Sequence, residues 1–374
     1  MPRYSPFAPI PIPTSNLLTF LSPPESPLHT STKPIWINSE DPSISLSTGA
    51  ALPWIKRLAM GLERFQVASG GSRVKRGEVV LVLSPNQIFV AVAYLGIVGS
   101  GRVFSGMNPN YSVQEMVYQM KNTEAKIILV HPSLVDNALA AAKQADISPD
   151  RLFQFSDTVN SNKNDVRDCN NGLLATTQES HSYQWPELTG GEGAKTIATI
   201  NYSSGTTGLP KGACMYTIIV AAKMQVPVYV MKKFVYEDFL RVIQDHKITQ
   251  LHVAPPIMVM LSKRPETAKY YPSSVKLITC GAAPLSRKLQ NEVSEKLGVI
   301  VQQGSGMTEE LIKVNALQVA PAELEAALLE HDGIADAAVV GMTLDDEEFP
   351  RAYVVPKENA KQTNSSTTPA QIQE

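Results

Sequence analysis

The sequence predicts an α/β protein built on doubly wound parallel sheets. Two runs rich in apolar residues, 78–83 and 125–131, are typical of strands buried on both faces. Segments with helical spacing follow them, at 88–98 and 133–145. This alternation of strand and helix favours right-handed crossovers and layers of helices on the sheets.

The other elements follow from similar patterns. In the first half we expect a strand at 35–37 and helices at 52–65 and 112–121, the second opened by a capping box from Ser112 to Glu115. Residues 156–193 are polar and predict an exposed loop. The second half predicts strands at 196–201, 226–231, 250–253, 275–279, 337–342 and 352–355, and helices at 236–246, 286–297 and 321–331.

Composition narrows the class of protein. Of 374 residues, 43% are apolar, which is enough for a substantial core, and the net charge of −2 includes no basic block. Nucleic acid and anionic membranes are therefore not expected partners. The three cysteines form no CxxC pair, which favours a reducing compartment. The apolar region 79–101 is interrupted at 84–87, so no membrane span is expected.

One glycine-rich loop carries a chemical signal. Residues 202–212 read YSSGTTGLPKG and follow a predicted strand. Hydroxyl groups, backbone N–H groups beside glycine and one lysine are what a phosphate cradle needs. The loop is not a Walker A motif, because Lys211 lies between Pro210 and Gly212. The alternative is a flexible Gly/Ser loop with no ligand.

This loop resembles the phosphate loop of the adenylate-forming superfamily, which includes acyl-CoA synthetases, 4-coumarate–CoA ligases and luciferases. The likeness extends over most of the chain and is closest to the 4-coumarate–CoA ligase branch. The segments that carry it are NPNYS at 108–112, CGAAPL at 280–285, QGSGMTE at 303–309 and IKVNALQVAPAELE at 312–325.

The resemblance implies an ATP-dependent acid–CoA ligase. A carboxylate would attack the α-phosphate of ATP, and the CoA thiol would then displace AMP; the implied cofactors are ATP, Mg²⁺ and CoA. Contacts to the ATP phosphates are implied for Ser203, Ser204, Gly205, Thr206, Thr207, Gly208 and Lys211. The adenine side is assigned to Gly281, Ala282, Ala283, Gln303 and Gly304. Thr308 would contact phosphate, Glu309 would hold Mg²⁺, and Lys313 and Gln318 would reach in from a small domain.

The sequence departs from the family pattern at several places. Glu309 and Glu310 are adjacent where the family has a long segment with a TGD motif and a hinge arginine. A second internal deletion is implied near 213–225, and no SGK lysine occurs after Lys357. Ser305 replaces an aromatic residue that stacks on adenine, and Ala316 replaces a glycine that lines the CoA tunnel.

These departures leave three hypotheses open. The first is an acid–CoA ligase. The second is a catalytically dead nucleotide-binding remnant, or a mis-spliced or mis-predicted chain. The third is an adenylating enzyme that passes its acyl group to an acceptor other than CoA. The expected partners are a small carboxylic acid, ATP and CoA; neither the acid nor the oligomeric state follows from the sequence.

We expect four regions. An irregular N-terminal arm spans 1–34, the large AMP-binding domain 35–309, the remnant of a truncated α+β C-terminal domain 310–357, and a disordered tail 358–374. The expected location is the cytoplasm, since the chain carries no SKL-type peroxisomal signal. His252, in an apolar strand, is interpreted as a core or substrate-wall residue.

Overall fold

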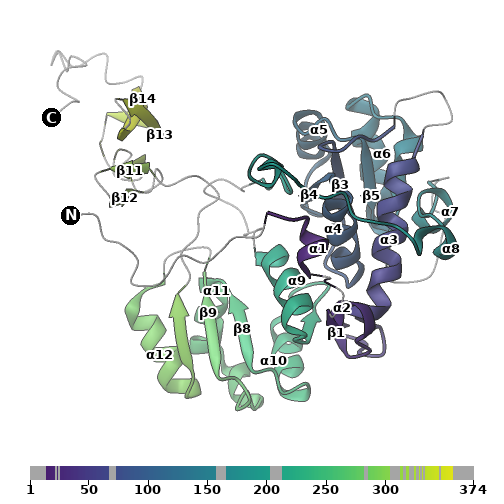
Figure 1. The fold of residues 1–374 in the computed structure, drawn as a ribbon. Helices are drawn as coiled ribbons and strands as arrows, with labels where there is room; N and C mark the ends of the chain where they lie inside the picture. The colour runs from purple at the N-terminus through teal and green to yellow at the C-terminus, as the bar shows by residue number, and fades with distance from the viewer. Residues whose placement is uncertain are drawn as a thin grey trace. The chain divides into compact units, whose positions relative to one another are not determined.

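The computed structural model describes most of the chain: residues 14–21, 23, 26–66, 73–156, 166–202, 213–281, 285–303, 312–314, 317–319, 324–325, 328, 331, 333–344 and 347–356. The chain divides into two compact units, one formed by Pro11–Gly304 and the other by Met1–Ile10 with Ser305–Glu374. Figure 1 shows the elements of both units in chain order.

A four-stranded parallel sheet forms the centre of the larger unit. Its strands are β3 (Val79–Leu83), β4 (Val103–Met107), β5 (Ile127–Val130) and β6 (Leu152–Gln154), in the order β4-β3-β5-β6. The predicted α/β fold with parallel strands is confirmed. The sequence did not predict β4, because Ser105 and Gly106 interrupt its apolar run, or β6, which has only three residues.

Helices cover both faces of this sheet. Helices α3 (Thr48–Arg64) and α4 (Phe89–Gly99) pack on one face, with Val80 and Val82 of β3. Helices α5 (Val113–Asn122) and α6 (Val135–Gln144), the second preceded by the 3-10 turn η1 (Pro132–Leu134), pack on the other, with Val79, Leu81 and Leu83. Strand β3 therefore supplies alternate residues to two cores, which explains its continuous apolar run. The predicted capping box between Ser112 and Glu115 is present.

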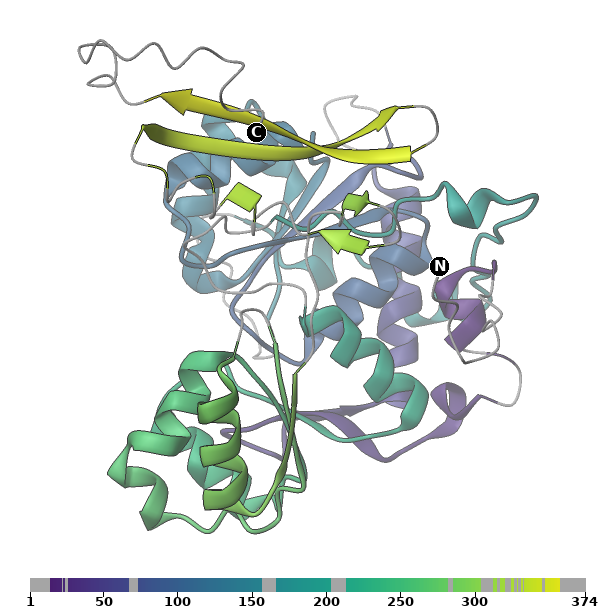
Figure 2. The same ribbon diagram turned by 90° about the vertical axis from the view of Figure 1, so that its left-hand side faces the viewer.

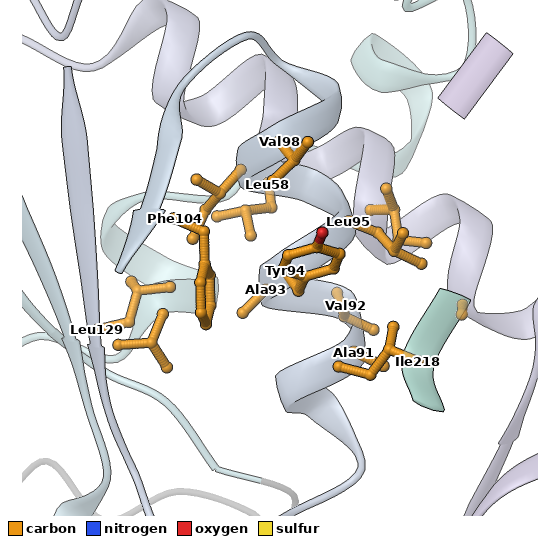
Figure 3. Close-up of a cluster of buried hydrophobic side chains, with 14 of the residues drawn as sticks. Leu58, Ala91, Val92, Ala93, Tyr94, Leu95, Val98, Phe104, Leu129 and Ile218 are labelled. Atoms are coloured by element: carbon orange, nitrogen blue, oxygen red, sulfur yellow. The ribbon is translucent and has the colours of Figure 1, made fainter. Parts of the chain in front are cut away.

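Helix α4 is buried at nine of its eleven positions. Figure 3 shows Tyr94 of α4 and Phe104 of β4 among the side chains of this core. Their rings meet edge to face, with centroids 5.3 Å apart. Ile218 of α9 (Ala213–Met224) joins the same core. The region where the sequence implied a deletion thus includes a helix of its own.

The N-terminal arm is more ordered than the sequence suggested. Its described part contains the short helices α1 (Leu17–Leu21) and α2 (Pro27–Thr30), and Leu18 is fully buried. A side chain at Gly99 would come within 2.6 Å of Leu18, so α1 packs closely on α4. The expectation of an irregular arm was wrong for these residues, because Leu18 and Leu21 supply the core with apolar surface.

The polar segment after β6 also packs on the core in its described part. It contains α7 (Cys169–Gly172), α8 (Thr177–Ser180) and the 3-10 turn η3 (Glu192–Ala194), and Leu173 is buried in the first core. The Arg57 side chain on α3 donates a hydrogen bond to the Ala175 carbonyl at 2.8 Å. The prediction of an exposed loop was therefore wrong for buried positions such as Leu173, Ala175 and Tyr183, whereas most of residues 187–193 are exposed as expected. Leu173 packs in the core that contains α3, and Val166 packs in the core on the other face of the sheet.

A three-stranded parallel sheet is covered on one side. It has the order β10-β9-β8, with β8 (Gln250–Val253), β9 (Leu277–Cys280) and β10 (Ile300–Gln303). Its core includes residues of α10 (Tyr236–Asp245), α11 (Pro255–Lys263) and α12 (Arg287–Leu297), with the 3-10 turn η5 (Pro265–Lys269) beside α11. Figure 2 shows the green helices gathered on one side of their strands.

A third sheet joins distant parts of the same unit. Strand β1 (Pro34–Asn38) pairs antiparallel with β2 (Ser45–Ser47) and parallel with β7 (Val228–Val230). The 3-10 turn η2 (Pro149–Arg151) precedes β6. The strand predicted at 196–201 is reduced to one parallel bridge between Phe104 and Thr199.

The smaller unit contains two antiparallel hairpins. One pairs β11 (Ile312–Val314) with β12 (Leu317–Val319), and the other pairs β13 (Ile334–Leu344) with β14 (Glu347–Pro356). Figure 2 shows the second hairpin, in yellow, as a long twisted ribbon. Most of the predicted helix 321–331 and all of the tail 358–374 lie outside the described residues. None of the helices in the described ranges has the length and apolar character that crossing a membrane requires.

Candidate nucleotide site

The predicted phosphate loop lies between two described segments. Residues 203–212, which include Ser203, Thr206, Gly208 and Lys211, are outside the described ranges. The segment before the loop pairs parallel to β4, so the chain leaves it at the carboxyl end of the sheet. Ligands of open α/β sheets bind at this end. The flanks thus direct the loop to the edge where a nucleotide is expected.

Tyr202 is the last described residue before the loop, and the sequence did not single it out. Its hydroxyl donates a hydrogen bond to the Asn122 side chain at the end of α5. Its ring meets that of Tyr118 edge to face, with centroids 6.4 Å apart. Burial, with smaller contributions from Tyr118 and Tyr111, raises the pKa of Tyr202, so the phenol stays protonated and can donate. Its partners are far away in sequence, and only the position of Tyr202 within the loop motif was available as a signal.

Two residues expected on the adenine side lie at the ends of neighbouring strands. Gly281 follows β9 directly and donates its N–H to the Val253 carbonyl at 3.1 Å. Gln303 ends β10 and is the register partner of Cys280. The structure therefore brings Gly281 and Gln303 to the same carboxyl edge of one sheet. Ala282, Ala283 and Gly304 lie outside the described residues.

The Gln303 side chain contacts Leu285 and Gln290, which follow β9 in the chain. Its oxygen accepts from the Leu285 N–H at 3.4 Å, and its nitrogen donates to the Gln290 side chain at 2.7 Å. Gly281 and Leu285 are thus each hydrogen-bonded to the sheet. Cys280, just before Gly281, is buried, and burial raises the pKa of its thiol. A neutral thiol is a poor nucleophile, so Cys280 serves the core.

The residues expected from the small domain are paired in the first hairpin. Lys313 of β11 and Gln318 of β12 are register partners, opposite each other in the ladder. Thr308 and Glu309, the expected phosphate and Mg²⁺ residues, lie outside the described ranges. Among the described residues, no three His, Cys, Asp or Glu side chains gather as a metal site.

Of the two interpretations of His252, the core position was wrong, and the substrate-wall position stays a prediction. His252 is exposed on β8, and its ring nitrogen lies 3.0 Å from the Gln250 side chain on the same strand face. The neighbouring Leu251 and Val253 point to the other face and are buried. The apolar surroundings in sequence therefore came from one face of the strand, and His252 belongs to the opposite face.

Comparisons with known proteins place the chain in a family. The model of the AMP-binding enzyme family matches residues 54–226 and 213–348, and the model of the AMP-binding enzyme C-terminal domain matches residues 323–374. The chain belongs to the AMP-binding enzyme family. The expected resemblance to the adenylate-forming superfamily is thus confirmed.

Curated relatives are acid–CoA ligases. The chain is 26% identical to the acyl-CoA synthetase ACTT5 of Alternaria alternata, over 86% of this chain and 78% of that protein. It is 28% identical to 4-coumarate–CoA ligase 3 of Arabidopsis thaliana, over 65% of this chain and 49% of that protein. A phenylacetyl-CoA ligase of Aspergillus niger, epaB, is 28% identical over 74% of this chain and 57% of its own length. The chain spans about half the length of the second and third of these relatives.

The alignment with ACTT5 is longer than the chain itself. It runs over 466 positions, whereas the chain has 374 residues, of which 86% are aligned. The relative therefore has many residues inside the matched region that this chain lacks.

Solved structures share the fold. A long-chain-fatty-acid–CoA ligase, FadD1 of Archaeoglobus fulgidus, has a TM-score of 0.64 at 17% identity, over 97% of this chain and 95% of that chain. MatB of Rhodopseudomonas palustris, solved with ATP bound, has a TM-score of 0.58 at 18% identity, over 96% of this chain and 90% of that chain. At these identities the likeness shows the fold alone.

Proposed function

We propose that the protein is an ATP-dependent acid–CoA ligase, which adenylates a small carboxylic acid and then transfers the acyl group to CoA. The observation that carries this proposal is the family match over residues 54–348, which includes the whole of YSSGTTGLPKG. The described flanks of that loop support it, since the chain enters the loop at the carboxyl end of a parallel sheet.

The first step joins two anions and needs fixed positive charge. The carboxylate oxygen attacks the α-phosphorus of ATP, the bond to the β-phosphate oxygen breaks, and pyrophosphate leaves. Lys211 supplies positive charge to the phosphates, and the hydroxyls of Ser203, Thr206 and Thr207 donate hydrogen bonds. Glu309 would hold Mg²⁺, which neutralises the phosphate charge when bound.

Other residues divide the remaining tasks. Gly281 and Gln303, together at one sheet edge, form the adenine side. Lys313 and Gln318, paired in the hairpin of the smaller unit, are the residues of that unit to which the family resemblance assigns a catalytic role. In the second step the CoA thiol attacks the acyl carbon, AMP leaves with the bonding electrons, and the thiol proton passes to solvent.

A product assay tests the proposal. The purified chain is incubated with ATP, Mg²⁺, CoA and a panel of aromatic and fatty acids, and AMP and thioesters are measured by mass spectrometry. We expect acid-dependent AMP and one or more thioesters. In the Lys211→Ala variant the rate should fall about 100- to 1,000-fold, as when one transition-state donor is removed. The absence of AMP and thioester across the panel would contradict the proposal.

A second candidate function is nucleotide binding without catalysis. It is favoured by the alignment with ACTT5, which has residues that this chain lacks, and by the direct join of Glu309 to Glu310. Saturable ATP binding with no AMP release would support it. Sequencing of the native message across this join separates a third case, in which a longer message restores the missing segment and the present chain is a product of mis-splicing or mis-prediction.

Formation of acyl-AMP without thioester would favour transfer to an acceptor other than CoA. The motivation is Ala316, in place of the glycine that lines the CoA tunnel in the family. The same assay with and without CoA distinguishes this outcome.

A further inference from the structure

The segment that leads into the phosphate loop is held to β4 by few main-chain bonds. The Phe104 N–H donates to the Ala198 carbonyl at 3.0 Å, and the Ile200 N–H donates to the Phe104 carbonyl at 2.9 Å. These two bonds form a single parallel bridge, in which Phe104 pairs with Thr199. One bridge is a weak attachment compared with the full ladders between β3, β4 and β5.

A buried serine extends the attachment beyond the bridge. The Ser105 hydroxyl donates to the Ile200 carbonyl at 2.8 Å, and Ser105 is fully buried. The Ser105 oxygen in turn accepts from the Gln119 side-chain amide at 3.1 Å. Gln119, on α5, is also fully buried and donates to the Gly106 carbonyl at 3.1 Å. Ser105 is therefore hydrogen-bonded both to Gln119 of helix α5 and to the main chain of Ile200.

Helix α5 also contacts Tyr202, which lies two residues after Ile200 in the segment before the loop. Asn122, the last residue of α5, accepts the hydrogen bond from the Tyr202 hydroxyl, and Tyr118 packs against the Tyr202 ring. Gln119 and Asn122 lie one turn apart on the helix. Gln119 reaches Ile200 through Ser105, and Asn122 contacts Tyr202 directly. These contacts match the spacing of alternate residues along an extended segment.

We propose that Ser105 and Gln119 are positioning residues for nucleotide binding, which fix the segment Ala198–Tyr202 and so the point where the phosphate loop begins. Neither residue touches the nucleotide; each acts through the main chain of Ile200. The part of the proposal that concerns nucleotide rests on the proposed function. A segment whose position is fixed before the nucleotide binds loses less conformational entropy on binding.

Hydrogen exchange tests the structural part without any ligand. Ser105→Ala should increase exchange in a peptide covering 196–202 about fivefold, because one buried hydrogen bond to the segment is lost. Ser100→Ala is the matched control: Ser100 is also fully buried and donates to a main-chain carbonyl, that of Ile97, at 2.8 Å. The control should lower the melting temperature similarly but leave this peptide unchanged.

Binding of ATP tests the functional part. Ser105→Ala and Gln119→Met should raise the Kd for ATP about three- to tenfold, whereas Ser100→Ala should not change it. If Ser105→Ala does not fold, Gln119→Met, which keeps the length and apolar stem of the side chain, decides the question. Unchanged exchange over 196–202 in the folded variants would overturn the inference. A different outcome is increased exchange in the variants together with no ATP binding by the unaltered chain. The anchoring contacts would then be supported, but their role in nucleotide binding would be overturned. The proposed function would also be contradicted.

Discussion

Both main sheets of the larger unit are parallel, but they are buried differently. In the four-stranded sheet, β3 and β5 are buried at every position, and two separate cores lie on the two faces. In the three-stranded sheet, β8 and β9 alternate between buried and more exposed positions, and the described residues form one core.

The outward face of the three-stranded sheet carries polar side chains beside Leu277 and Ile300, whereas β3 and β5 of the other sheet are apolar on both faces. The Gln302 side chain donates to the Thr279 hydroxyl at 3.0 Å across two strands, and Gln250 lies beside His252 on β8. Polar groups on this face therefore satisfy one another. We therefore expect stability to be concentrated in the four-stranded sheet, whereas both sheets present candidate binding residues or their flanks at their carboxyl edges.

The largest expected effect is a difference between two isoleucines. Ile128 on β5 is fully buried, whereas Ile300 on β10 is 69% exposed. Ile128→Ala should lower the free energy of unfolding by about 2–5 kcal/mol, since it removes buried methyl groups and leaves a cavity. Ile300→Ala should change it by less than about 0.5 kcal/mol. Denaturant unfolding of both variants measures this; similar losses would show that the outward face of β10 is covered.

A second test concerns the layer that covers the four-stranded sheet. A side chain at Gly61 of α3 would overlap the carbonyl oxygen of Leu173, so Gly61→Ala must displace the segment 166–193. The expected loss of stability is about 1–3 kcal/mol. Gly106→Ala on β4 is the control, because its nearest contact would be the Phe104 ring at 3.5 Å, an ordinary van der Waals distance. If both variants unfold at the same denaturant concentration, the segment does not pack on α3 as described.

The sequence predicted burial in the four-stranded sheet better than burial in the three-stranded sheet. The continuous run of β3 indicated burial on both faces, and this was confirmed. The alternation in Gln250-Leu251-His252-Val253 was available too, but the strand was interpreted as apolar, and the core interpretation of His252 was wrong for that reason.

The sequence predicted which motifs form the candidate site, but it did not predict how their residues are arranged in space. The side chains and glycines of YSSGTTGLPKG have the chemistry that phosphate binding needs, and their role as phosphate ligands stays a prediction. The contacts of Ser105 with Ile200 and of Tyr202 with Asn122 join positions 95 and 80 residues apart. Such pairs depend on how the sheet and α5 pack, which no local pattern in the sequence contains.

The smallest expected effect is on the stability at alkaline pH, through Tyr183 in the segment 166–193. Burial, with the Glu63 carboxylate nearby, raises the pKa of Tyr183 from 10.0 to about 12. A folded-state pKa above the unfolded value gives stability that is present below pH 10 and lost as the pH rises towards 12. Tyr183→Phe removes this ionisation, so its stability should fall less steeply over that range than that of the unaltered chain. Urea unfolding between pH 8 and 11 measures the slopes; equal slopes would contradict the burial of Tyr183.

The most direct test of the central claim is acid-dependent turnover of ATP by the purified chain. Radiolabelled ATP, Mg²⁺ and the acid panel are mixed with the chain at stoichiometric concentration, and AMP is measured over a single turnover. The proposed function predicts AMP in amounts that depend on the acid and that Lys211→Ala abolishes within the same time. Saturable ATP binding with no acid-dependent AMP would contradict it and leave a nucleotide-binding protein without catalysis.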